Sequence, residues 1–441
     1  MLALAGAAAA PAHARPAVIA GADPEAYSLD LHYVAEGTGR LTGTERIHFL
    51  NRGPAAIDRV WLRLWANGPD RCQPRAIDVH IEAPARAGAE SVKCSALEVQ
   101  LPAAVAPGAG GSISLAFTVR VRHKDDRFGH ARGISLLGNV IPVLAVQDDR
   151  GLHLEPYSDN GESFYSLAAR WDATLTLPAN LRAATTGAAV SEHVHKGLRT
   201  LHLETPQARD FALAVGPFQV TSTTEKGVRI RAFARPRAHT VRRALRAARR
   251  AVSIYTRRLA PFGGKELDMV LLGGGVGGFG GMEYPELIFT MPLGEVVAHE
   301  IAHQWWFGIV GDDQYHDPWL DESFASYFEE RQYPFEDQCD VRRPYDLVAP
   351  WRRKFPLDAS MAVFDRHPIA YVEVVYAAGS CALQSLEHDI GRSRMTQVVR
   401  LLQSRFRFGV MRESDVIAAI REVVPRYDLA GWERRAHLTS P

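Results

Sequence analysis

The sequence predicts a multidomain α+β protein in which an antiparallel β domain precedes an α/β domain that ends in helices. Residues 24–220 contain short apolar or alternating segments between Gly, Pro and Asn turns, such as RIHFL, RVWLRLW, SISLAFTVRV and ATLTLP. After Gly227, strands give way to segments with apolar residues every three or four positions, and helical stretches such as SRMTQVVRLLQSRF reach the end. With 441 residues, 46% of them hydrophobic and 23% charged, the chain can bury two or more cores. We expect a β domain over 24–220 and a second domain over 221–441.

Residues 1–23 form a separate N-terminal segment. MLALAGAAAAPAHARP resembles the end of a secretory signal, with an apolar stretch and an A-x-A site at Ala12 to Ala14, but it has no basic residues before the apolar stretch. It is either a signal that begins upstream of this start or a short, alanine-rich disordered tail. The first interpretation favours export to a periplasmic or extracellular location, and the second leaves a cytoplasmic location open.

The four cysteines permit three disulfide pairings. Cys72 and Cys94 both fall in the strand-rich region, which favours their pairing. Cys339 and Cys381 are a second pair or buried thiols. No cysteine has the spacing of a metal site.

Charge and glycine patterns argue against nucleotide and nucleic-acid partners. The formal net charge is +1, which provides no attractive field for a polyanion. The arginine-rich stretch RPRAHTVRRALRAARRAVSIYTRR has apolar residues at Val241, Leu245, Val252 and Tyr255, so we predict an amphipathic helix near 238–259 with a solvated arginine face. GGGVGG at 273–278 contains G-x-G-x-x-G, but the extended GMEYPELIF follows it where a dinucleotide site requires a helix. No segment is expected to insert stably into a membrane.

VVAHEIAHQWW, at 296–306, contains a candidate zinc site. Apolar residues at helical spacing predict a helix, and His299 and His303 then lie one turn apart on one face, where both imidazoles can reach one zinc ion. Glu300 falls beside them, placed to take a proton from the water that the metal activates. Two core histidines with a chance glutamate between them are the alternative.

A third ligand is available on the next predicted helix. In HDPWLDESFASYFEER, Asp317 and Pro318 are typical of an N-cap and a first helical residue, and Glu322 follows in about the first turn. Eighteen residues separate His303 from Glu322, enough for the loop GIVGDDQYHD and a return to the first helix. Glu322 can therefore complete a His₂Glu site for one zinc ion per chain.

These motifs resemble the M1 family of gluzincin zinc metallopeptidases, most of which are aminopeptidases. GGMEYP at 280–285 is similar to the family's exopeptidase motif G-x-M-E-N, which implies that Gly281, Met282 and Glu283 bind substrate and that Glu283 holds its free amino group. YVEVVYAAGSCAL at 371–383 is similar to the segment whose tyrosine stabilises the tetrahedral intermediate, a role that maps onto Tyr376, with Tyr371 as the alternative. The similarity covers most of the chain from about Glu162 onward.

The resemblance also implies a fold, although several positions differ from the family pattern. We expect a saddle-like N-terminal β domain and a thermolysin-like catalytic domain with a mainly helical C-terminal lobe, ending where larger members add a further helical domain. Tyr284 replaces the motif's asparagine, and Ala378 stands where lysine is usual. The stretch from Glu283 to His299 is shorter than in the family, which indicates a trimmed loop or edge strand. No residue of the N-terminal domain can be matched to the family's second amine-binding residue.

The resemblance therefore implies a zinc aminopeptidase acting on peptides. His299, His303 and Glu322 hold the metal, Glu300 moves the proton, Tyr376 stabilises the developing oxyanion and Glu283 fixes the N-terminus. A zinc endopeptidase of the same fold and a catalytically silent peptide-binding scaffold are the alternatives. Side-chain preference, physiological substrate and oligomeric state are not determined by the sequence.

Overall fold

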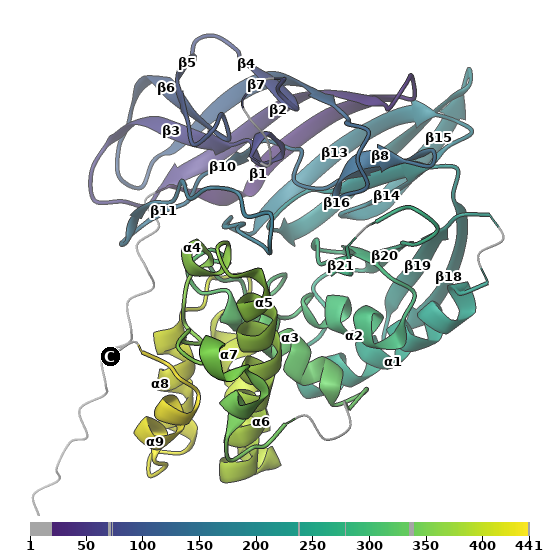
Figure 1. Ribbon diagram of the computed structural model, residues 1–441. Coiled ribbons are helices and arrows are strands. Elements are labelled where there is room, and N and C mark those ends of the chain that lie inside the picture. The colour runs from purple at the N-terminus through teal and green to yellow at the C-terminus, as the bar shows by residue number, and fades with distance from the viewer. Residues whose placement is uncertain are drawn as a thin grey trace, which may run out of the picture.

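The computed structural model describes residues 20–68, 72, 74–236, 239–277, 279–334 and 339–439, with side chains described from residue 27 onward. Figure 1 shows a β-rich half lying across a largely helical half. Most of the signal-like segment 1–23 lies outside the described residues. Within the described residues, β1 begins at Ala20.

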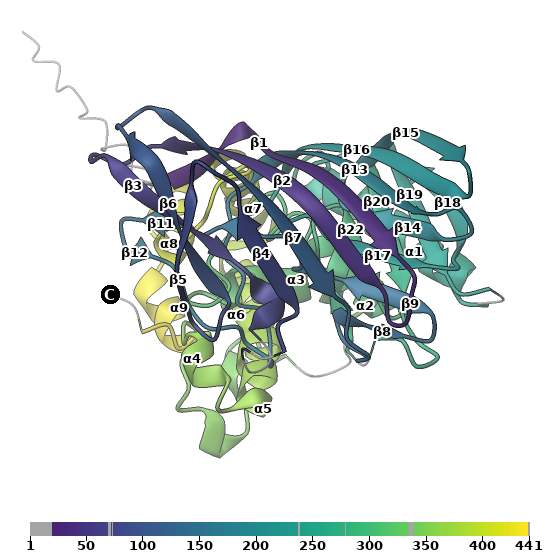
Figure 2. The same cartoon turned by 90° about the horizontal axis from the view of Figure 1, so that it is seen from above.

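The largest sheet of the N-terminal half has nine strands among the described residues. Its strands follow the order β15 (Ala188–His195), β16 (Leu198–Ala208), β13 (Ala169–Pro178), β1 (Ala20–Val34), β2 (Arg40–Asn51), β7 (Gly110–Arg120) and β4 (Ile77–Ile81). In addition, β11 (Gln147–Asp148) pairs with β1, and β12 (Gly151–Leu152) pairs with β11. Alternate residues of β2 and β13 are buried, as the alternating sequence pattern predicts. Figure 2 shows these strands running side by side from above.

Two smaller sheets complete this half. One contains β10 (Val143–Leu144), β3 (Ile57–Arg63), β6 (Ala96–Val105) and β5 (Arg86–Ser91), and the other β14 (Arg182–Thr185), β17 (Leu213–Gly216), β9 (Ile134–Leu137) and β8 (Phe128–Ala131). The expected antiparallel pattern has one exception, because β1 and β13 pair in parallel, with Tyr27 opposite Trp171. A long connection separates these strands in sequence, so no hairpin turn forces them to run in opposite directions.

A mixed sheet begins the second half. Its order is β18 (Gln219–Glu225), β19 (Val228–Ala234), β20 (Glu266–Leu271), β22 (Leu287–Thr290) and β21 (Gly281–Met282), with parallel β19–β20 and β20–β22 pairs. The change from one group of sheets to the other falls between β17 and β18, next to the expected boundary after Val220. Met269 and Ile288 face the helical core, whereas Val270 and Phe289 face the core of the β domain. This sheet therefore joins the two halves through both of its faces.

The helices cover the mixed sheet and form the C-terminal lobe. They are α1 (Val241–Arg258), α2 (Gly294–Ala302), α3 (Trp319–Glu330), α4 (Met361–Phe364), α5 (Pro368–Tyr371), the π-helix η4 (Val372–Ala378), α6 (Gly379–Ile390), α7 (Arg392–Arg405), α8 (Glu413–Val423) and α9 (Leu429–Arg435), with 3₁₀ turns η1 (Trp65–Asn67), η2 (Pro344–Leu347) and η3 (Pro350–Arg352). In α1, Leu245, Val252 and Tyr255 are buried, which confirms the amphipathic arginine helix.

Several local expectations can be compared directly with the structure. Gly273 and Gly274 have φ values of 115° and 63°, and β21 rather than a helix follows the glycine loop. Disulfides join Cys72 to Cys94, as expected, and Cys339 to Cys381, the first of the two alternatives for that pair.

Within the described residues, one helical stretch, Pro368–Ile390, is long and apolar enough to cross a membrane, and an 18-residue window within it has a mean hydropathy of 1.3. However, 67% of that window is buried inside the molecule. Burial of this kind is typical of a core helix, which explains its hydropathy without a bilayer.

Candidate active site

Three side chains from α2 and α3 converge on one buried point. The Nε2 atoms of His299 and His303 lie 3.1 Å apart, and Glu322 Oε2 lies 3.1 Å and 3.2 Å from them respectively. Tetrahedral ligands at zinc's usual distances are separated by about 3.3 Å. The donor set and its spacing therefore fit one zinc ion.

The helix boundaries explain this geometry. α2 ends at Ala302, and His303 is its C-cap with helical dihedrals, so the one-turn relation to His299 is preserved. The expected N-cap role of Asp317 is wrong, because Pro318 precedes the first residue of α3 and the Asp317 carboxylate instead accepts a hydrogen bond from Arg150 at 3.1 Å. Glu322 is still in the first turn of α3, as expected.

The second nitrogen of each histidine is also engaged. His299 Nδ1 lies 3.1 Å from Glu329 Oε2, and His303 Nδ1 lies 3.1 Å from the carbonyl oxygen of Trp306. Such partners orient metal-binding imidazoles and leave Nε2 for the metal. Although burial lowers the pKa of His303, Glu322 raises it to about 10, which shows that this pocket attracts positive charge.

Glu300 lies beside the three ligands without joining them. The Glu300 side chain is buried. Its carboxylate lies against the backbone of β21 at Gly281, where any larger residue would clash, because an added Cβ atom would lie 2.1 Å from Glu300 Oε1. Burial raises the pKa of Glu300 to about 8, against the opposing effect of the two histidines. A carboxylate whose pKa lies near neutrality is suited to both accepting and returning a proton.

The π-helix η4 brings Tyr376 to the same point. Its hydroxyl donates a hydrogen bond of 2.6 Å to Glu322 Oε1, and its ring stacks on His299 with centroids 5.7 Å apart. Tyr371, the alternative, has a buried hydroxyl without a hydrogen-bond partner and lies against Gly161. The geometry thus brings Tyr376, and not Tyr371, to the ligands. A π-turn is common where a helix carries a functional side chain.

A cleft of about 420 Å³ opens onto the ligands and contains the expected amine anchor. Glu283 lines it at 3% exposure, and Gln314 Nε2 donates to its Oε1 at 2.9 Å. Gly281 lines the cleft too, but the Met282 side chain is buried in the core of the β domain. Successive residues of a strand face opposite sides, so Met282 can offer only its backbone to a substrate.

Tyr284, which replaces the motif's asparagine, ties this segment to the β domain. Its hydroxyl donates a 2.8 Å hydrogen bond to Asn139 Oδ1, and Asn139 Nδ2 donates at 2.8 Å to Asp210. Only β22 intervenes between this segment and α2, which accounts for the short stretch before His299.

Sequence reasoning missed the residues of the β domain that reach the cleft, and two of them form a charged pair. Glu162 and Arg127 line it, and they form an ion pair with Nη1 and Oε1 separated by 3.1 Å. Burial, and next the negative charge of Glu283, raise the pKa of Glu162 well above its usual value. Both residues lie outside regular strands or at their ends, where no periodic pattern indicates a role.

Comparisons with known proteins show which family the chain resembles. Residues 290–430 match the model of the Peptidase family M1 domain. Aminopeptidase N of Haemonchus contortus is 27% identical over 292 residues, which represent 58% of this chain and 30% of that protein. Glutamyl aminopeptidase of Homo sapiens is 29% identical over 140 residues, 29% of this chain and 14% of that protein. The chain thus spans less than a third of the length of these two relatives.

Solved structures share the fold over nearly the whole chain. An M1 zinc metallopeptidase from Deinococcus radiodurans aligns with a TM-score of 0.68 and 18% identity, covering 96% of this chain and 95% of that chain. A mutant M1 zinc metallopeptidase from the same organism, bound to a Tyr-Ser-Ala substrate, aligns with a TM-score of 0.65 and 19% identity over 96% and 95% of the two chains. The predicted arrangement of a β-rich domain followed by a helical region is confirmed.

Proposed function

We propose, on the premise that residues 290–430 form a peptidase family M1 domain, that the chain is a zinc-dependent aminopeptidase. The observation that carries this proposal is the convergence of His299, His303 and Glu322 at 3.1–3.2 Å. It lies beside a cleft that Glu300, Tyr376 and Glu283 line. A peptide substrate is the ligand class to which these groups are suited.

The metal and the side chains divide the chemistry between them. Zinc in a site of this kind acts as a Lewis acid toward water and the scissile carbonyl. Glu300 takes the proton of the attacking water and returns it to the departing amine, for which its raised pKa of about 8 is suited. The Tyr376 hydroxyl, already a donor to Glu322, supplies a hydrogen bond to the oxygen that becomes negative as the carbonyl is attacked.

The cleft has an acidic lining that favours an amino terminus. Glu283 and Glu162 both line it, and the charge of Glu283 raises the pKa of Glu162, so the two carboxylates lie close enough to repel each other. An ammonium group between them would relieve that repulsion and form charge-assisted hydrogen bonds. We propose Glu162, held by Arg127, as the amine-binding residue of the β domain that the sequence did not reveal. An endopeptidase or a silent scaffold does not need to bind a substrate's ammonium group, so the pair Glu283 and Glu162 favours the aminopeptidase.

The direct test is to follow peptide degradation over time. The zinc-loaded protein should release residues one at a time from the N-terminus of an unmodified peptide, as seen by mass spectrometry. A zinc chelator should stop the release, and added zinc should restore it. Cleavage that begins at internal bonds would support the endopeptidase alternative, and no cleavage across a varied peptide panel would support the scaffold.

Export from the cytoplasm is a separate proposal. The disulfides Cys72–Cys94 and Cys339–Cys381 support it, because such bonds persist in oxidising compartments. Cell fractionation, with N-terminal sequencing of the recovered protein, tests it. Recovery of the protein with reduced cysteines from the cytoplasm would contradict export.

A further inference from the structure

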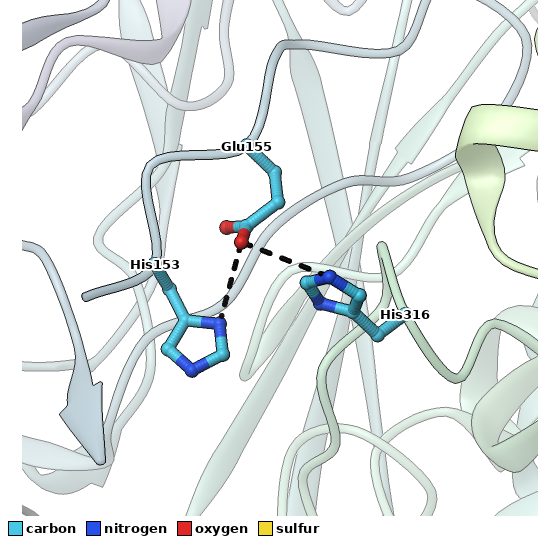
Figure 3. Close-up of side chains that lie close together, drawn as sticks. All are labelled: His153, Glu155 and His316. Carbon is cyan, nitrogen blue, oxygen red and sulfur yellow. Dashed lines mark ion pairs between the residues drawn. The ribbon is translucent and has the colours of Figure 1, made fainter. Parts of the chain in front are cut away.

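A second histidine–carboxylate cluster lies where the β domain meets the loop between α2 and α3. His153 and Glu155 follow β12, and His316 comes from the loop, so the three side chains approach one another from two domains (Figure 3). Glu155 Oε1 lies 3.5 Å from His153 Nδ1 and 3.8 Å from His316 Nε2. One donor atom from each residue falls within 4.8 Å of the other two.

Each imidazole is oriented from behind by a carboxylate. His153 Nε2 lies 2.9 Å from Asp148 Oδ1, and His316 Nδ1 lies 2.7 Å from Asp313 Oδ2. If each of these nitrogens carries its ring's proton, His153 Nδ1 and His316 Nε2 present lone pairs toward Glu155. The same arrangement, with an acceptor behind each ring, orients His299 and His303 in the catalytic cluster.

The strongest indication of a bound ligand is the unsatisfied His153 Nδ1 atom. The His153 side chain is 5% exposed, and this nitrogen has no hydrogen-bond partner. A buried polar atom left unsatisfied is costly unless an ion or water fills the gap. Its nearest charged neighbours are Glu155 and Asp313, whose Oδ2 lies 3.3 Å away.

The charge balance of the cluster also favours a cation. With neutral imidazoles, the cluster holds four carboxylates, those of Asp148, Asp149, Glu155 and Asp313. Two guanidinium groups oppose them: Arg412 pairs with Asp148 at 3.1 Å and also with Asp149, and Arg63 Nη2 donates to the Glu155 carbonyl oxygen at 2.6 Å. Two negative charges remain unbalanced, and a divalent cation would neutralise them. Two imidazoles and a carboxylate are ligands that zinc prefers.

We propose that His153, Glu155 and His316 bind a second divalent transition-metal ion, with zinc as the best match, at the junction of the two domains. Asp313 or water would complete the coordination. The donor atoms lie at most 4.8 Å apart, up to about 1.5 Å more than the separation of about 3.3 Å between tetrahedral zinc ligands. The His316 side chain is 38% exposed, so its rotation can bring the donors closer.

This ion would stabilise the loop that serves the active site. Asp313 and His316 flank Gln314, whose Nε2 donates to Glu283 at 2.9 Å and to Asp321 at 2.8 Å. Fixing the loop to the β domain therefore also fixes the residue that positions the proposed amine anchor. Excess zinc should raise the Tm beyond the value reached when only the catalytic site is filled, by about 2 °C or more.

The test counts zinc per chain after equilibrium dialysis against about 1 µM free zinc, well above the dissociation constants typical of structural sites. The full chain should bind two ions. His316→Ala and Glu155→Gln should each bind one, and Glu322→Ala should also bind one because it loses the catalytic ion instead. The double variant Glu322→Ala/His316→Ala should bind none. Glu155 and His316 are partly exposed, so their replacement tests the second site without changing the buried His153, whose replacement endangers folding.

His202 provides the matched control. It also lies near two carboxylates, Asp172 and Glu204, but its Nε2 faces both of them and the group lies on a half-exposed sheet surface. His202→Ala should therefore retain two ions. Anomalous scattering at the zinc edge should show a peak between His153 and His316.

The number of zinc ions per chain can also contradict the second metal site. One ion in the unmodified chain would mean that a proton, rather than a metal, joins His153 to its carboxylates. Two ions in both His316→Ala and Glu155→Gln, or a second peak elsewhere, would equally overturn the proposal. None of these readouts depends on peptide cleavage, so the second site and the proposed activity fail independently.

Discussion

Replacing Glu283 with glutamine should weaken the preference for a free amino terminus while leaving the shape of the site intact. The Glu283 side chain is almost fully buried and held by Gln314, so its charge is poorly screened and its position is fixed. Glutamine has the same size and can still accept a hydrogen bond from Gln314. The substitution therefore tests the charge rather than the packing.

The expected magnitude follows from the interaction lost. A hydrogen bond to a charged group contributes about 1.5–3 kcal/mol, and 1.36 kcal/mol corresponds to tenfold in rate, so kcat/KM for a free peptide should fall about 10- to 150-fold. An N-acetylated peptide of the same sequence has no ammonium group and should be cleaved slowly by both proteins. Glu162 remains in the variant, so a smaller preference should survive.

The assay is a cycle of two proteins and two peptides. Its four kcat/KM values give the coupling free energy between the Glu283 carboxylate and the substrate's amino group. Effects of the substitution that are common to both peptides cancel in this cycle. Glu295→Gln is the matched control, because Glu295 lies in the first turn of α2 but outside the cleft lining, and its loss should affect both peptides equally. An undiminished free-amine preference in Glu283→Gln would refute the assigned role. Equal cleavage of both peptides by the unmodified protein would refute the aminopeptidase proposal.

Three further outcomes are expected. Glu300→Gln should keep the zinc content of the unmodified protein and lose about 10²- to 10⁴-fold in kcat, since the residue moves protons but is not a ligand; loss of metal would contradict this. Tyr376→Phe should lower kcat by about two orders of magnitude with little change in KM, and Tyr371→Phe should not, so the reverse result would exchange their roles. Replacing Cys339 and Cys381 with serine should lower the free energy of unfolding by about 4 kcal/mol in denaturant titrations, as expected for a loop of this length, and an unchanged midpoint would show that the bond contributes nothing.

The local chemistry of the metal cluster was predictable because its signals are short. His299, Glu300 and His303 lie within one helical turn and a half, and Glu322 lies in the first turn of the next helix, so periodicity and spacing place all four. The same reasoning failed at the start of α3. Asp317 has the composition of an N-cap, but Arg150 of the β domain binds its carboxylate, and such a tertiary contact is invisible to a local rule.

The contribution of the β domain to the cleft was not predictable for a related reason. Glu162 and Arg127 meet Glu283 only after three separate segments of chain have folded together. His153 and His316 are likewise more than 160 positions apart. Neither group repeats with a helical or strand period, and no spacing rule connects residues so far apart.

The β domain also fixes the backbone that follows the first metal helix. Phe307, just beyond His303, has a φ of 121°, a conformation that non-glycine residues rarely adopt and that surrounding contacts must maintain. Buried Arg209 supplies one such contact, since its Nε donates to the Phe307 carbonyl at 2.6 Å while its Nη1 donates to the Ser166 carbonyl at 3.0 Å. The path of the chain from His303 toward α3 is therefore set partly by a side chain of the other domain. The position of Glu322 relative to the two histidines depends on that path, so the metal geometry belongs to the two domains together.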